Sequence, residues 1–73
     1  MAAAGVQSVE RALGLLDLLA ERGGVGSVSE LAEAAGLSQP TAHRLLNTMQ
    51  RLGYVQRHSG RKYALGARTM LVG

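Results

Sequence analysis

Several residue types are missing from this 73-residue chain, and each absence excludes a class of structure or chemistry. The chain contains no cysteine, which excludes disulfides, thiolate metal sites and thiol nucleophiles. It also contains no phenylalanine or tryptophan, so its core must be aliphatic, built mostly from leucine and valine. A chain of this length supports one small domain with a modest core.

No stretch of the sequence is apolar for long enough to cross a membrane. The longest apolar segment, residues 9–20, is interrupted by Glu10, Arg11 and Asp17, and it is shorter than the roughly 20 apolar residues that a bilayer requires. Residues 1–7 are mostly small and carry no charge, which predicts a flexible tail rather than a targeting peptide. We therefore expect a cytoplasmic domain with no membrane partner.

Acidic residues are confined to the first half of the chain. Residues 1–37 contain two basic and five acidic residues, a net charge of −3, whereas residues 38–73 contain six basic and no acidic residues, a net charge of +6. A basic surface on one side of a domain is typical of proteins that bind a polyanion such as nucleic acid. Charge alone leaves open the alternative of a solvated basic face without a partner.

Apolar residues at helical spacing predict two helices in the first half. Ser8 is a suitable N-cap for the first helix, and glycines 23–24 follow its end. Ser27 and Glu30 have the spacing of a capping box at the start of the second helix, and Ser29 is an alternative cap. Gly36 terminates this helix. The inward stripe of the first helix is predicted to comprise Val9, Ala12, Leu13, Leu16, Leu19 and Ala20, with Leu15 and Leu18 off the stripe.

A third helix is predicted from about residue 39 to residue 52. Ser38 caps it, and Pro40 lies in its first turn, where a missing N–H group costs no hydrogen bond. Gly53 closes the helix. Its apolar stripe comprises Ala42, Leu45, Leu46, Met49 and Leu52.

A hairpin and the start of a fourth helix are predicted after the third helix. Residues 54–55 and 63–65 have the composition of two short strands around a turn, and residues 25–27 are either a loop or a short strand. This order predicts a mainly α fold, a winged helix-turn-helix of three helices and a two-stranded wing. We assign the domain to residues 8–66 and the start of a linker helix to residues 67–73.

Only three residues, Gly36, Leu37 and Ser38, join the second and third helices. Two short helices joined by a glycine-containing turn form a helix-turn-helix unit. Ala32 lies four residues before Gly36, and its small side chain allows the third helix to cross closely. These features favour a helix-turn-helix over the alternative of a three-helix bundle without a nucleic-acid role.

The outward face of the third helix carries side chains suited to double-stranded DNA. At about 100° per residue, the apolar stripe leaves polar and basic residues, and no acid, pointing outward. Such side chains bond base edges and phosphates, and the N-terminal part of a recognition helix reaches the bases. We predict DNA contacts by Ser38, Gln39, Pro40, Thr41, His43, Arg44, Asn47 and Arg51, with Gln39, Thr41, His43 and Arg44 as base readers and Pro40 against a thymine methyl group.

The predicted wing supplies a second group of DNA contacts. Arg57, Arg61 and Lys62 cluster around a glycine-containing turn. A basic hairpin tip reaches a phosphate or enters a narrow minor groove, where arginine is attracted. A solvated turn is the alternative.

The sequence offers no pattern for catalysis, a metal or a cofactor. Neither histidine, His43 or His58, has another ligand at metal-binding spacing. The acidic residues fall on exposed helix faces, where we interpret them as solubilising charges. We therefore expect a domain that is not an enzyme and that binds no cofactor.

Three motifs resemble the N-terminal domain of the isocitrate-lyase-regulator (IclR) family of bacterial transcription regulators. They are Gln7-Ser8-Val9-Glu10-Arg11-Ala12-Leu13, Thr41-Ala42-His43-Arg44-Leu45-Leu46 followed by Gly53-Tyr54, and Tyr63-Ala64-Leu65-Gly66. The resemblance implies a homo-oligomeric repressor or activator of a palindromic operator. It also implies that a small-molecule effector binds a larger C-terminal domain outside these residues. Ser38-Gln39-Pro40 differs from the family's Pro-x-Ser order, so the family's operator preference is not carried over.

Two other interpretations remain open at this point. A winged helix that binds a protein partner would carry an apolar or acidic outer face on the third helix, and here that face is polar and basic. A MarR-type regulator would also bind DNA, but would require flanking dimerisation helices.

Overall fold

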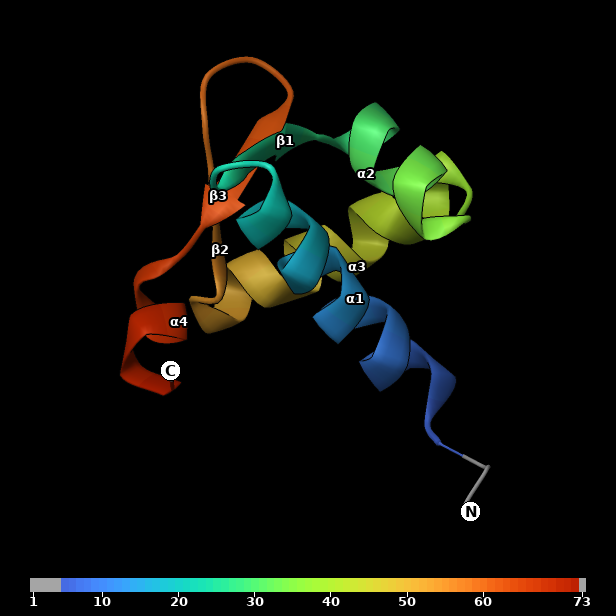
Figure 1. The fold of residues 1–73 in the computed structure, drawn as a ribbon, viewed down its shortest axis with the longest axis horizontal. Coiled ribbons are helices and arrows are strands. Elements are labelled where there is room, and N and C mark those ends of the chain that lie inside the picture. Colours follow the sequence, from blue (N-terminus) through green and yellow to red (C-terminus); the bar gives the residue numbers. More distant parts are fainter. Residues whose placement is uncertain (1–4, 73) are drawn as a thin grey trace.

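The computed structural model describes residues 5–72, which form a three-helix core, a small sheet and a short last helix (Figure 1). The elements in chain order are α1 (Gln7–Glu21), β1 (Val25–Ser27), α2 (Val28–Ala35), α3 (Gln39–Leu52), β2 (Val55–Arg57), β3 (Lys62–Leu65) and α4 (Ala67–Val72). The predicted tail at residues 1–7 falls largely outside the described residues, and Gln7 already belongs to α1. The fourth helix begins where the sequence predicted it.

The sheet has three antiparallel strands in the order β1-β3-β2. β2 and β3 form the predicted wing hairpin, with Arg57 opposite Tyr63. β1 pairs with the other edge of β3, with Gly26 opposite Tyr63. The two-stranded wing was therefore an incomplete prediction, because a three-residue strand has too little alternation to be told from a loop. β1 ties the start of α2 to the wing.

The turn between α2 and α3 forms as the sequence predicts. Ser27 and Glu30 make a reciprocal capping box, with Ser27 N–H donating to Glu30 Oε1 at 3.2 Å and Glu30 N–H donating to Ser27 Oγ at 3.1 Å. Gly36 ends α2 at φ 72°, a left-handed conformation that residues with a side chain resist. Ser38 Oγ then accepts from the Thr41 N–H at 3.3 Å and starts α3. This geometry fixes the direction in which α3 leaves α2.

The predicted inward face of α1 is correct for Ala12, Leu16 and Leu19, which are buried or pack against the core, and wrong for the rest of the stripe. Leu15 and Leu19 are fully buried, whereas Val9 and Leu13 are 53% and 56% exposed. Leucine occurs on several sides of this helix, so periodicity alone did not decide which side packs against α2 and α3. The predicted cap is also wrong, since α1 begins at Gln7 after Val6, which makes no side-chain capping bond. Ser8 therefore does not cap α1.

The core joins all three long helices to the sheet. Its fully or almost fully buried residues are Leu15, Leu19, Leu31, Leu46, Met49, Val55 and Tyr63. Leu52, predicted to face inward, is instead 57% exposed at the last position of α3. No helix in the described part of the chain is long and apolar enough to cross a membrane.

Gly66 places the end of the wing against the end of α3. Its N–H donates to Tyr54 O at 2.8 Å. A Cβ added to Gly66 would collide with the Gly53 carbonyl oxygen and lie 2.9 Å from the Tyr54 carbonyl carbon. The absent side chain therefore permits this close approach, which anchors the base of the wing to the end of α3.

Candidate nucleic-acid interface

The solvent-facing side of α3 presents the side chains predicted to contact DNA. Gln39, Pro40, His43, Arg44 and Arg51 are exposed, as is the cap residue Ser38. Thr41 and Asn47 are half-buried. At about 100° per residue, His43 and Gln39 lie toward one flank of the helix and Thr41 toward the other. The predicted residues of α3 thus form a single polar surface with two distinct flanks.

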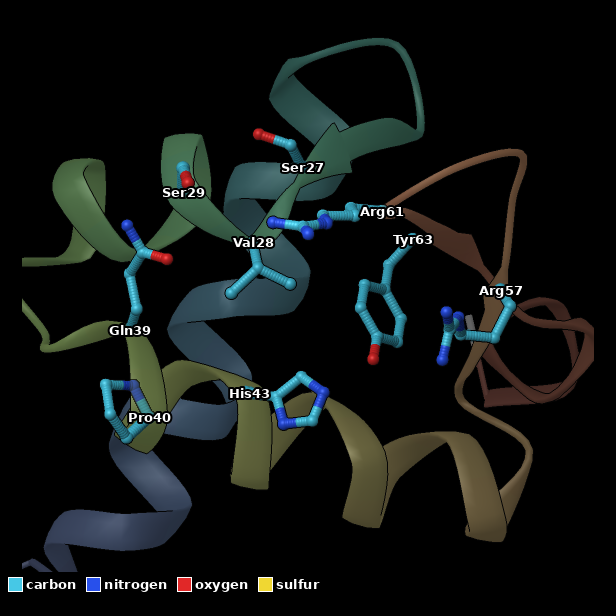
Figure 2. Close-up of a pocket in the computed structure, with 9 residues that line it drawn as sticks. All are labelled: Ser27, Val28, Ser29, Gln39, Pro40, His43, Arg57, Arg61 and Tyr63. Carbon is cyan, nitrogen blue, oxygen red and sulfur yellow. The ribbon is translucent and has the colours of Figure 1, made fainter.

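A groove of about 510 Å³ separates the N-terminal half of α3 from the wing (Figure 2). Arg57 and Arg61 approach it from the wing, and His43 approaches it from α3. Its lining residues are Ser27, Val28, Ser29, Gln39, Pro40, His43, Arg57, Arg61 and Tyr63. None of these is acidic, so the groove is an electropositive channel between the two elements predicted to bind DNA.

Tyr63 crosses from the wing to the recognition helix beneath this groove. The side chain is 1% exposed, and its hydroxyl donates to Asn47 Oδ1 at 2.9 Å. The Arg57 guanidinium carbon lies 5.4 Å from the centre of the Tyr63 ring, within cation–π range. Figure 2 shows the ring between Arg57 and His43. One buried tyrosine therefore contacts Arg57 on the wing and Asn47 on α3.

Asn47 receives this hydrogen bond and points its amide nitrogen toward His43. The distance from Asn47 Nδ2 to each His43 ring nitrogen is 3.5 Å, the length of a weak contact. The Tyr63 hydroxyl takes one acceptor position of the carbonyl oxygen, and the amide N–H groups of Asn47 are the donors that it can offer a base or phosphate. The predicted DNA contact of Asn47 remains a prediction.

Glu30 lies near the groove but is held in the capping box of α2. The pKa of its carboxyl is lowered, chiefly because the Ser27 N–H donates to the carboxylate, and the Ser27 hydroxyl acts in the same direction. The positive charges of Arg22 and Lys62 contribute smaller effects of the same sign. The Glu30 carboxylate is thus committed to the start of α2.

The predicted DNA-contacting residues and the lining of the groove do not coincide completely. Lys62 is exposed on β3 next to Arg61, but it does not line the groove. Ser27, Val28 and Ser29 line the groove although the sequence did not mark them, because only the pairing of β1 with β3 brings them there. Within residues 5–72, no three potential metal ligands among His, Asp and Glu lie close enough to hold a metal ion.

The sequence matches the model of one family, described as the IclR helix-turn-helix domain, over residues 8–59. The transcriptional repressor IclR of Escherichia coli K12 is 47% identical over 70 residues, which cover 93% of this chain and 25% of that protein. The glycerol operon regulatory protein of Streptomyces coelicolor is 41% identical over 73 residues, or 97% of this chain and 28% of that protein. The chain spans about a quarter of the length of these relatives.

Solved structures show the same fold. An IclR-type transcriptional regulator from Alicyclobacillus acidocaldarius superposes with a TM-score of 0.87 at 30% identity, covering 94% of this chain and 28% of that one. The Zalpha domain of Carassius auratus PKZ, solved in complex with Z-DNA, gives a TM-score of 0.74 at 21% identity, covering 82% of this chain and 98% of that one, and supports the winged-helix fold alone. The chain belongs to the IclR family of transcription regulators, of which it contains the helix-turn-helix domain.

Proposed function

We propose that this domain binds double-stranded DNA sequence-specifically, as the DNA-reading part of a bacterial transcription regulator. The observation that carries the proposal is the groove between α3 and the wing, which has two arginines and no carboxylate along its lining. A phosphodiester backbone fits between these walls while α3 enters the major groove. The names of the relatives, among them a repressor, support a role in repression.

Each part of the surface has a distinct role in this proposal. Gln39, Thr41, His43 and Arg44 lie on the first two turns of α3, the part of a recognition helix that reaches base edges. Pro40 is placed to contact a thymine methyl group. The second set holds the phosphate backbone or the minor groove and comprises Arg57, Arg61 and Lys62.

We also propose that two copies act together on a palindromic operator, and that a further domain outside these residues binds the effector. Leu15, which lies off the predicted inward stripe of α1 and would have been available to a second copy, is buried and cannot serve there. An apolar groove of about 560 Å³ beside the exposed Leu13 and Val9 offers a better surface for a second copy. It has no lining residue in common with the groove at the wing, so a second copy placed there leaves that groove open.

Selection from a random-sequence duplex library tests the proposal directly, because the operator is unknown. We expect enrichment of a defined half-site and tighter binding to it than to a scrambled duplex of the same length. Each mismatched base pair should cost about 1–3 kcal/mol. Failure to bind any duplex would favour the alternative of a protein-interaction module, and binding without enrichment would contradict sequence-specific reading.

A further inference from the structure

A second polar groove lies on the opposite flank of α3 from the wing. Its volume is about 300 Å³, and it runs between the first turns of α1 and the side of α3. Ser8 and Arg11 form the α1 wall, and the α3 wall comprises Thr41, Arg44, Leu45 and Thr48. The sequence alone gave no reason to place Arg11 near the recognition helix, since 30 residues separate it from Thr41.

The charge of this groove matches that of the groove at the wing. Both contain two arginines and no acidic residue. By contrast, the apolar groove beside α1 and a further groove between α1 and α2 each include Asp17. Arg11 also borders the groove between α1 and α2, yet the acids there, Glu10 and Asp17, do not extend into the α3 groove. Carboxylates are thus excluded from both flanks of α3.

Of the three hydroxyl groups that line this groove, those of Ser8 and Thr41 make no hydrogen-bond donation within residues 5–72. Thr41 Oγ1 accepts a hydrogen bond from Ser38 Oγ at 2.9 Å, which leaves the Thr41 hydroxyl proton for an outside acceptor. Ser8 has no capping bond to make, because Val6 occupies the N-cap position of α1. Thr48 differs, since its hydroxyl donates to Arg44 O at 2.9 Å. Two hydroxyls and two guanidinium groups therefore face this groove.

The dimensions of DNA indicate which ligand this second groove could bind. A helix about 10–12 Å across fills a major groove about 12 Å wide, so each flank of the inserted helix faces one phosphate backbone. We propose that Arg11, together with Ser8 and Thr41, binds a phosphate of the DNA strand opposite the one held by the wing. This inference rests on the proposed insertion of α3 into the major groove. α1 then contributes to DNA binding as well as to the core.

Replacement of Arg11 tests this contact against a control arginine at the C-cap of α1. Arg11→Ala should weaken binding to selected and random duplexes by the same factor, and flatten the slope of log affinity against log salt by about 0.9, the value for one phosphate. Arg22→Ala is the control, because Arg22 is exposed at the end of α1 and borders neither groove. Arg11→Lys should restore most of the slope, since it keeps the charge. Circular dichroism confirms that each variant is folded.

Neutral methylphosphonate substitutions locate the phosphate. At one position, on the strand opposite the wing contact, neutralisation should remove the difference between the wild type and Arg11→Ala. The inference is overturned if Arg11→Ala behaves like Arg22→Ala, or if no position abolishes that difference. Failure of the proposed function is separable, because Arg61→Ala would then also leave DNA binding unchanged.

Discussion

Tyr63 connects the wing to α3, the two elements proposed to contact DNA. It comes from the wing, is buried, and orients the Asn47 carboxamide on the recognition helix. The hydroxyl is too deeply placed to be a base reader itself. Its effect on DNA therefore passes through Asn47 and, through the ring, through Arg57. This makes Tyr63 a positioning residue.

Tyr63→Phe removes the hydroxyl and keeps the packing of the ring. We expect a loss of unfolding free energy of about 0.5–1.5 kcal/mol, typical of one hydrogen bond. We also expect a smaller ratio of specific to random affinity well below the melting temperature, because the released Asn47 carboxamide no longer has a fixed orientation. Tyr54→Phe is the control. A lower melting temperature with an unchanged ratio would mean that the hydroxyl is purely structural.

Substitutions of Arg44 and Arg61 test whether different residues read the bases and bind the phosphates. Arg44→Ala should weaken binding to the selected duplex by about 1–3 kcal/mol and relax the preference at one or two base pairs. Arg61→Ala should weaken binding to all duplexes alike and flatten the salt slope by about one unit. Titrations of selected and random duplexes measure both effects. Identical behaviour of the two variants would show that the assignment of roles is wrong.

The start of α2 makes folding stability depend on pH. The lowered pKa of Glu30 means that its carboxylate stabilises the folded state at pH values above the ordinary glutamate pKa, about 4.3. That contribution is lost as the pH falls through the lowered pKa of the folded state. Glu30→Gln retains a hydrogen-bond acceptor that does not titrate, so it should lose less stability on acidification than the wild type.

Thermal unfolding at a series of pH values from 7 downward measures the difference in acid-induced loss of stability between the wild type and Glu30→Gln. Glu33→Gln is the control, since Glu33 is exposed on the same helix and lies outside the capping box. Its acid-induced loss of stability should match that of the wild type. If Glu30→Gln and the wild type lost stability in parallel, the capping box would not be the source of the pH dependence.

Elements with local signals were predictable from the sequence, and contacts between distant elements were not. The second and third helices carry their own caps in Ser27, Gly36 and Ser38, and all three caps form. α1 carries leucine on several sides, so the packing of α2 and α3 decides which side is buried. The walls of both polar grooves depend on tertiary structure, through the pairing of β1 with β3 and the crossing of α1 beside α3.

At the scale of the whole molecule, self-association is expected to be weak and to involve α1. Leu13 and Leu52 are similarly exposed, 56% and 57%, but Leu13 borders the apolar groove and Leu52 does not. Leu13→Gln should abolish weak dimerisation, and Leu52→Gln should leave it unchanged. Sedimentation equilibrium from about 10 µM to 1 mM, concentrations chosen to detect a weak dimer, compares them. A strictly monomeric wild type throughout, or equal effects of the two variants, would contradict this interface.

The basic face of the molecule is the basis of the whole account. The second half of the chain has six basic and no acidic residues, of which Arg44 and Arg51 lie on α3 and the other four follow it. Each phosphate that they neutralise releases counterions, so affinity must fall as salt rises.

Titration of the domain onto duplex DNA across a range of salt concentrations tests that basis most directly. With roughly three to five phosphate contacts, we predict a log–log slope of about −3 to −4.5. A slope near zero would contradict the account, because neither the wing nor the flanks of α3 would then be in contact with the DNA backbone.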